Sequence, residues 1–399
     1  MSSFIGFPLA LGAAPIKNDG LLADLLIPDT YIVKYKPNVG SIRRKSHEED
    51  IDGKARNASR KGIFDKFTIP GLQGYVAEIP PSELILLTDC DLIDYIERDT
   101  IIKSTAIANP HSKRTMVTQS HAPWGLARIS HRARNHPDTY YYSDTAGHDT
   151  RIYVLDTGIR LSHAEFAPSR AVWGANFVAS SPDTDEDGHG THVAGIISGG
   201  TYGVAKKATV VAVKVLDKTG TGSMSGLLRG LNWAVDDAKR RGVVRKAVVN
   251  MSLTGAYTES VNDGVQAATD AGMTVVAAAG NDGGDVAEWS PASAASAVTV
   301  GAMDRQDTRA EFSNWGSGMD VFAPGVGVES ASNETDKATS ALSGTSVAAP
   351  HVAGLAAYFI AREGLSGSEV KKRLLSAANK GMRDRKGSAD RIAYNAGGA

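Results

Sequence analysis

Four residues of this sequence have side chains that together could transfer an acyl group, and each stands beside or close to a glycine. They are Asp156, His189, Asn281 and Ser346. Acyl transfer needs a nucleophile, a base that takes its proton, a group that orients the base and a donor that stabilises the oxyanion. Serine, histidine, aspartate and asparagine can fill these roles in that order. The four residues as a set therefore indicate acyl-transfer chemistry.

Taken singly, each of these residues also has an ordinary structural explanation. Ser346 lies in a long run of small and apolar residues, Ser343 to Gly364, which predicts a helix buried on nearly all sides. A serine near the start of such a helix commonly caps it. Asp156 and Asn281 each follow an apolar run and stand close to glycine, as turn residues do. For each residue alone, the structural and the catalytic interpretations stay open.

Two metal-binding interpretations compete around His189. His189 and His192 are three residues apart and on a helix could share a metal ion, but the segment has neither an HExxH pattern nor a cysteine. The acidic stretch 183–188 matches the opening of an EF-hand calcium loop, but Ala194 stands at the twelfth position, where a glutamate is required. A solvated acidic loop leading into His189 explains the stretch better.

The candidate residues follow short apolar runs without alternation, which predict strands covered on both faces. Helical patterns separate these runs, for example at 226–239 and 260–271. Alternating strands and helices predict an α/β fold, a doubly wound parallel sheet with helices on both faces. Such sheets bind ligands beyond the carboxyl ends of their strands, so the candidate residues fall where a site is expected. The runs lie at 151–155, 209–215, 246–251 and 273–278.

The first hundred residues have a different pattern. Strand-like segments at 31–35, 74–79 and 94–102, with a helix start at Pro80, predict a small α/β unit, and the polar stretch 106–119 predicts a linker. The apolar run from Phe4 to Pro15 resembles a secretory signal, although neither lysine nor arginine precedes it.

Length and composition exclude several classes of protein. With 399 residues, of which 42% are hydrophobic, the chain can bury a sizeable core and would contain two or more domains. A net charge of −1 gives no indication of nucleic-acid binding. Cys90 is the only cysteine, so no intramolecular disulfide can form. No other apolar run approaches the roughly 18 residues that a bilayer-spanning helix needs.

Three segments resemble the signature sequences of subtilisin-like serine proteases, in that family's order of aspartate, histidine and serine: 156–158, 189–195 and 344–354. Segments 122–130 and 312–316 resemble the proteinase K branch, and the similarity extends from Ala122 to about Leu375. Residues 31–102 resemble the inhibitor I9-type propeptide of the same family. The resemblance implies four parts: a signal peptide at 1–17, a small α+β ferredoxin-like propeptide at 29–104, a processing linker at 105–116 and a subtilisin-like catalytic domain at 117–399.

The resemblance also implies a role for each candidate residue. Ser346 would attack the peptide carbonyl, His189 would move its proton and Asp156 would orient His189. Asn281 and the Ser346 amide would stabilise the oxyanion. Substrate would bind as an added strand between two segments, and small uncharged walls predict a broad, apolar or aromatic preference. These segments are Gly220-Thr221-Gly222 and Ser252-Leu253-Thr254-Gly255, and the pocket would be walled by Leu253 to Gly255 and by Ala278-Ala279-Gly280.

This sequence departs from the proteinase K branch at Val193, where relatives often carry a free cysteine, and in having no disulfide. The chemistry requires no cofactor. A family calcium site would map to the Asp320 carboxylate and the carbonyls of Ala295 and Ala297, although Asp320 could equally be a turn residue. We therefore expect core packing, and a structural calcium ion at Asp320, to stabilise the fold.

The resemblance implies a secreted, monomeric endopeptidase made as a zymogen, with its own propeptide as an intramolecular inhibitor. Its partners would be protein and peptide substrates, not nucleic acid or membranes. Cleavage would fall between Lys113 and Val117, either at Met116-Val117 or beside the dibasic pair. A vacuolar protease and a non-catalytic protein on the same scaffold are the alternatives, and the four filled positions argue against the second. An esterase is excluded because the segment 344–348 lacks the second glycine of GxSxG.

Overall fold

The computed structural model describes residues 14–18, 20–21, 25–104, 107–108, 120–133 and 138–396. Its contacts divide the chain into two compact units, Met1–Thr100 and Ile101–Ala399. Most of the predicted signal peptide and the predicted cleavage bonds between Lys113 and Val117 lie outside the described residues. Within the described part of the chain, no helix combines the length and the apolar character needed to cross a membrane.

The first unit contains an antiparallel sheet of strand order β4-β1-β3-β2, with helices α1 and α2. The strands predicted near 31–35 and 74–79 are confirmed. No helix is predicted from the sequence at α1, because charged residues lie on nearly every side of it, and only Ile51 and Ala55 are buried against the core of this unit. The elements are β1 (Leu26–Tyr35), α1 (Ser41–Asn57), β2 (Gly62–Ile69), β3 (Leu72–Glu78), α2 (Leu84–Thr88) and β4 (Ile93–Ser104), whose last four residues belong to the second unit.

The second unit is built on a seven-stranded parallel sheet of order β15-β14-β12-β10-β6-β8-β7. The predicted α/β class is confirmed, and each of the four predicted apolar runs forms a strand. Their residues are almost completely buried, as continuous apolar runs require. The strands are β6 (Arg151–Asp156), β7 (Ala171–Asn176), β8 (Thr209–Lys214), β10 (Ala247–Met251), β12 (Thr274–Ala278), β14 (Val298–Met303) and β15 (Val321–Pro324).

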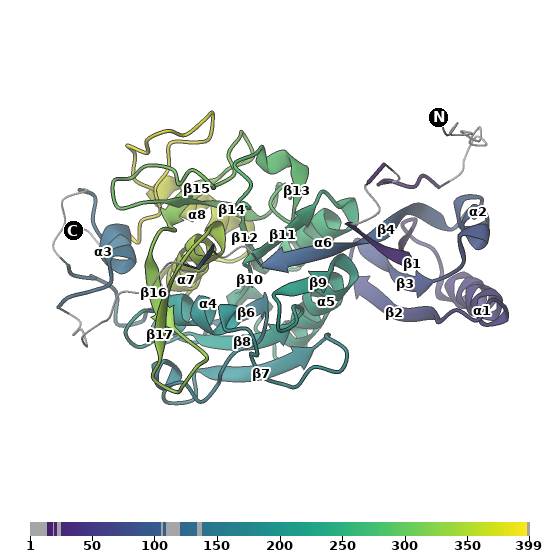
Figure 1. The fold of residues 1–399 in the computed structure, drawn as a ribbon, viewed down its shortest axis with the longest axis horizontal. Helices are drawn as coiled ribbons and strands as arrows, with labels where there is room; N and C mark the ends of the chain where they lie inside the picture. Colours follow the sequence, from purple (N-terminus) through teal and green to yellow (C-terminus); the bar gives the residue numbers. More distant parts are fainter. Residues whose placement is uncertain are drawn as a thin grey trace. The chain divides into compact units, whose positions relative to one another are not determined.

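Helices cover both faces of this sheet (Figure 1). On one face α7 packs its small residues, such as Ala349 and Ala353, against Val248 and Val276 of the central strands. On the other face Trp233 of α5 meets Tyr153 of β6, with ring centroids 6.2 Å apart. The helices are α3 (Trp124–Ser130), α4 (His189–Ser198), α5 (Met224–Arg240), α6 (Glu259–Asp270), α7 (Thr345–Glu363) and α8 (Ser368–Ala377).

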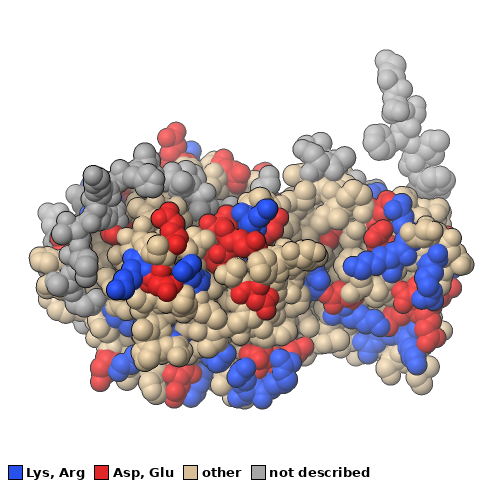
Figure 2. Space-filling view, turned by 60° about the horizontal axis from the view of Figure 1, so that its bottom comes forward, with Lys and Arg blue, Asp and Glu red and all other residues tan. Residues whose placement is uncertain are grey.

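Short strands lie outside the parallel sheet. They are β5 (Ile107–Ala108), β9 (Thr221–Ser223), β11 (Leu253–Ala256), β13 (Trp289–Ser290), β16 (Val328–Ala331) and β17 (Thr339–Ser343). Acidic and basic side chains are intermingled on the face drawn in Figure 2, in keeping with a net charge of −1.

Candidate active site

Asp156 and His189 form a hydrogen-bonded pair that is closed to solvent. Asp156 is the last residue of β6, and His189 is the first residue of α4. His189 Nδ1 lies 2.7 Å from Asp156 Oδ1, and the two residues are 4% and 0% exposed. Asp156 Oδ1 also accepts a hydrogen bond from the Thr157 amide at 2.8 Å. Asp156 is therefore hydrogen-bonded both within the turn that follows it and to His189.

Thr157 and Asp185 brace this pair. The Thr157 hydroxyl accepts from the Gly190 amide at 2.9 Å and donates to Asp185 Oδ1 at 2.8 Å, which ties the end of β6 to the first turn of α4. A Cβ at Gly190 would lie 2.1 Å from the Gly158 carbonyl oxygen, so only glycine permits this close approach. The orientation of His189 thus depends on groups that do not take part in the chemistry.

The oxygens of Asp185 are occupied by protein donors rather than exposed in a solvated loop. Asp185 is 5% exposed, and its carboxylate accepts from the amides of Asp187, Gly188 and Thr191 as well as from the Thr191 hydroxyl. The acidic stretch 183–188 is therefore partly a buried brace, which corrects the expectation of a solvated loop. Within the described residues, no group of three or more His, Cys, Asp or Glu side chains is arranged to hold a metal ion.

Ser346 is the second residue of α7 and is completely buried. Gly344 occupies the N-cap position, so Ser346 is not the cap of its helix. The Ser252 hydroxyl donates to the Ser346 carbonyl at 2.7 Å and accepts from the Asn250 side-chain amide at 3.0 Å. The first turn of α7 is thereby fixed to the residue that directly follows β10.

Asn281 contacts the same turn of α7 from the other side. Its Oδ1 accepts from both the amide and the hydroxyl of Thr345, each at 2.9 Å. The Thr345 hydroxyl in turn accepts from the Gly280 amide at 3.1 Å. These bonds use the oxygen of the Asn281 side chain, so its NH2 end is the end that can donate to a developing oxyanion.

All four candidate residues lie at one edge of the parallel sheet. Strand β10 is the direct neighbour of β6 on one side and of β12 on the other. Asp156 ends β6, Ser252 follows β10 and Asn281 comes three residues after the end of β12. Because parallel strands end at a common edge, these contacts bring the Asp156–His189 pair and the Asn281–α7 turn to the same place. His189 Nε2, the nitrogen a nucleophile would use, makes no hydrogen bond among the described residues.

The predicted substrate segments form two short strands with a third strand paired between them. Ile101, Ile102 and Lys103 pair antiparallel with Ser223, Gly222 and Thr221 of β9. On the opposite side, Lys103 and Ser104 pair with Thr254 and Leu253 of β11. Further along, Ile107 and Ala108 of β5 pair with Ser343 and Leu342 of β17, directly before α7. The chain's own residues 101–104 therefore form a strand between the two predicted substrate segments.

The predicted pocket wall at Ala278-Ala279-Gly280 is the buried end of β12 and the residues that follow it. Asn314 fixes this segment, because its Nδ2 donates to the Ala279 carbonyl at 2.9 Å and its Oδ1 accepts from the amides of Asp282 and Gly284. With only methyl groups and a glycine along this wall, no charged side chain projects from it.

The electrostatic environment distinguishes His189 from two other buried histidines, His192 and His351. Burial lowers the pKa of His189, but the neighbouring carboxylates, Asp156 first and then Asp187 and Asp185, together outweigh burial, so the pKa lies above the ordinary value of 6.5. Burial lowers the pKa of His192 to about 3 and that of His351 to about 4. Of these three histidines, His189 is therefore the one whose surroundings raise its pKa.

The predicted metal ligand Asp320 has a protein partner. Lys371 Nζ of α8 lies 2.7 Å from Asp320 Oδ2 and donates to the carbonyls of Ala295 and Ala297. These are the three residues to which the predicted calcium site maps, and an ammonium group reaches all of them.

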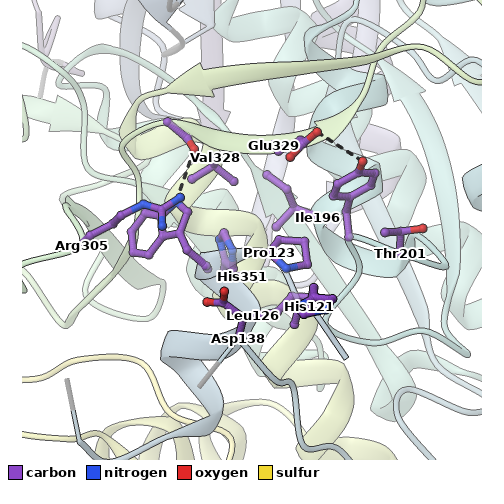
Figure 3. A pocket seen from close by; sticks show the side chains of 15 residues that line it. His121, Pro123, Leu126, Asp138, Ile196, Thr201, Arg305, Val328, Glu329 and His351 are labelled. Carbon is purple, nitrogen blue, oxygen red and sulfur yellow. Dashed lines mark hydrogen bonds between the residues drawn. The ribbon is translucent and has the colours of Figure 1, made fainter. Parts of the chain in front are cut away.

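A separate cavity of about 250 Å³ lies between α3, α4, α7 and β16 (Figure 3). Ile196 of α4 and His351 of α7 belong to its wall, and the Tyr202 hydroxyl donates to Glu329 Oε1 across one side at 3.5 Å. None of the four candidate residues lines it. The two helices that carry His189 and Ser346 thus expose other residues to this cavity.

Several residues of the site were not predicted as such from the sequence. Thr157, Asp185, Thr345 and Asn314 all hold candidate residues in place through hydrogen bonds. Three of them lie within four residues of a predicted catalytic residue, which is the signal that could have drawn attention to them. Asn314 lies 33 positions after Asn281 in the sequence. Only the folding of the chain brings it to the residues on either side of Asn281.

Comparisons with known proteins show what the whole chain is similar to. A model described as the subtilase family matches residues 147–394. Subtilisin-like protease 2 of Pseudogymnoascus destructans is 45% identical over 390 residues, which cover 97% of this chain and 93% of that protein. A cuticle-degrading serine protease of Arthrobotrys oligospora is 42% identical over 387 residues, covering 92% and 91%. The crystal structure of a cold adapted subtilisin-like serine proteinase matches with a TM-score of 0.66 and 39% identity, over 69% of this chain and 99% of that chain.

Proposed function

The chain belongs to the subtilase family and is a serine endopeptidase, and we propose that it cuts proteins through a triad of Asp156, His189 and Ser346 with Asn281 in the oxyanion site. The observation that carries this assignment is the buried 2.7 Å bond between Asp156 and His189, at the sheet edge where Asn281 holds the first turn of α7. That arrangement provides an oriented base, His189, on one side of Ser346 and a hydrogen-bond donor, Asn281, on the other.

The reaction follows from these positions. Ser346 Oγ attacks the carbonyl carbon of the peptide bond, and its proton passes to His189 Nε2. The negative charge that develops on the carbonyl oxygen is stabilised by the Asn281 NH2 group and the Ser346 amide at the positive end of α7. Protonated His189 gives its proton to the leaving amine, and water then releases the acyl group by the reverse sequence. Asp156 keeps the other proton on Nδ1, so Nε2 is available as the base.

Substrate would bind as an extended strand between β9 and β11. The pairing of residues 101–104 with both strands supports this mode, because it uses the same main-chain donors and acceptors. The methyl-lined wall at Ala278-Ala279-Gly280 supports a preference for apolar or aromatic side chains before the cut bond. Discrimination among such side chains would be modest, since a pocket of this kind has no polar group to reject an alternative.

We further propose that the enzyme is a secreted zymogen that processes itself. Residues 101–104 pair in the cleft, and residues 107–108 pair beside the segment that leads into Ser346. This arrangement supports a first self-cleavage at a bond between Ser104 and Ile107. A second cut, at one of the bonds predicted between Lys113 and Val117, would then remove the linker residues that remain. A vacuolar location is the alternative to secretion, and locating the tagged protein separates the two.

The decisive test is to label the nucleophile. The purified enzyme is assayed on casein or an apolar chromogenic peptide, treated with a serine-directed covalent inhibitor, and digested for mass spectrometry. We expect loss of activity with one inhibitor attached per chain, at Ser346. Full activity with an unlabelled Ser346, or a label on another serine, would refute the assignment.

A further inference from the structure

The environment of Lys371 is unusual for a lysine on a short surface helix. Its side chain is only 20% exposed, and its ammonium group lies 2.7 Å from Asp320 Oδ2, 2.9 Å from the Ala295 carbonyl and 2.5 Å from the Ala297 carbonyl. An ammonium group has three N–H donors. Each of them has an oxygen partner here, so the group is fully coordinated by the protein.

The three oxygens are held in place by the fold rather than by the lysine. Asp320 stands directly before β15, and its Oδ2 accepts from the Thr299 amide at 2.9 Å while its own amide donates to the Thr299 carbonyl. Ala295 and Ala297 lie in the segment that leads into β14, the neighbour of β15 in the sheet. The cluster is therefore a preformed group of oxygens between two strand starts.

Helix α8 presents Lys371 to this cluster from a fixed position. Val370 and Leu374 of the same helix are 0% and 4% exposed and belong to the core of the second unit. The Thr274 hydroxyl also donates to the Gly367 carbonyl, just before the helix starts. Because the backbone of α8 is already anchored, only the side chain of Lys371 loses conformational freedom when it reaches the oxygens.

The same oxygens are those expected to bind calcium, and they do not fit a calcium ion while Lys371 is present. Calcium takes six to eight oxygens at about 2.3–2.6 Å. An ammonium nitrogen already within 3 Å of all three protein oxygens occupies that space, and its positive charge repels a divalent cation. One site cannot hold both.

We propose that Lys371 takes the place of a structural calcium ion, so that this part of the catalytic unit is stabilised by a covalently attached cation. The positive charge that neutralises Asp320 and organises the two carbonyls is then part of the chain. The occupancy of this oxygen cluster therefore does not depend on the calcium concentration. Removing the ammonium group would leave one carboxylate and two carbonyls in a geometry that calcium can use.

The test measures thermal unfolding of the full chain in a Ser346→Ala background, which prevents self-digestion, with calcium chloride or with a chelator. The parent protein should unfold at the same temperature in both buffers, within about 1 °C. Lys371→Ala should unfold several degrees lower in the chelator. It should regain roughly 5 °C in millimolar calcium, as expected for a ligand near a hundred times its Kd. Adding Asp320→Asn to Lys371→Ala should abolish the gain.

Two further variants control for failure to fold and for effects of calcium elsewhere on the chain. Lys371→Met retains the apolar stem and removes only the charge, so it replaces the alanine variant if that protein fails to fold. Lys372→Ala, on the exposed side of the same helix, should behave as the parent does. Calcium alone, titrated calorimetrically, should bind one more ion per chain in Lys371→Met than in the parent. The proposal is overturned if calcium stabilises the parent through Asp320, or if neither Lys371 variant responds to calcium more than the parent.

Discussion

The 2.7 Å bond from His189 Nδ1 to Asp156 Oδ1 joins the first residue of α4 to the last residue of β6, with neither residue more than 4% exposed. Such a pair fixes two properties of the imidazole: which nitrogen carries the proton, and the pH at which the second proton is bound. Both properties can be measured.

The raised pKa of His189 predicts the acidic limb of the pH profile. The base must be neutral, and an unperturbed histidine titrates near 6.5. Because Asp156, with smaller contributions from Asp187 and Asp185, more than offsets burial and raises the pKa, kcat/KM should fall to half at a pH above 6.5 and then about tenfold per pH unit. Asp156→Asn should lower that midpoint and reduce kcat by about 10⁴-fold. An initial-rate profile on a neutral peptide checks this, and half-activity at pH 6 or below would contradict it.

Asn281→Ala should lower kcat by about 10²–10³-fold with little change in KM, because the lost hydrogen bond forms only as the oxyanion develops. The variant also loses two bonds to Thr345, which should cost about 1–3 kcal/mol of stability. Thr345→Val, which removes one of those bonds and retains the Asn281 NH2 group, is the matched control. Steady-state kinetics and thermal unfolding of both variants separate the two effects. Equal losses of kcat would refute the oxyanion role.

Substrate binding through β11 can be tested at Thr254. Thr254→Pro removes a main-chain donor from the strand that pairs with Lys103, whereas Thr254→Val retains it. For an extended peptide substrate, we expect the proline variant to raise KM about 3–10-fold, the value of one hydrogen bond of roughly 0.5–1.5 kcal/mol. The valine variant should stay within twofold of the parent. If both variants change KM alike, the side chain rather than the strand pairing is responsible.

Self-processing is tested with Ser346→Ala, which should accumulate as the uncut chain. Ser376→Ala, an exposed serine on α8, should mature normally. In the parent, N-terminal sequencing of the earliest product should give a start between residues 105 and 107, and the final product a start near Val117. Maturation of Ser346→Ala in a pure preparation would exclude self-processing. An earliest start at Val117 would place the first cut beyond the paired segments.

The parts of the fold that the sequence predicts are those in which one residue pattern has one structural solution. Short, continuous apolar runs such as 151–155 and 273–278, separated by helical patterns, favour strands buried on both faces, and they are β6 and β12. Helix α1 has no such pattern. Only Ile51 and Ala55 are buried, so tertiary packing rather than periodicity decides its structure.

The residues of the candidate site also differ in whether the sequence alone predicts them. Asp156, His189, Asn281 and Ser346 stand in short, recognisable segments. The groups that hold them do not, because a threonine such as Thr157 or an asparagine such as Asn314 is common in turns and gains its role from a partner distant in sequence. The expectation at Asp320 shows the same limit. A carboxylate and two carbonyls are compatible with calcium, and only the fold reveals that Lys371, which is 51 residues from Asp320 and still further from the two alanines, reaches all three.

The strand pairing of residues 101–104 has a kinetic consequence. The segment that pairs with β9 and β11 belongs to the same chain as Ser346, so the self-cleavage that we propose would need no encounter with a second molecule. Under this proposal activation would be first order, so its half-time would stay constant on dilution. A single molecule would then become active at a rate that does not depend on how much of the protein is made.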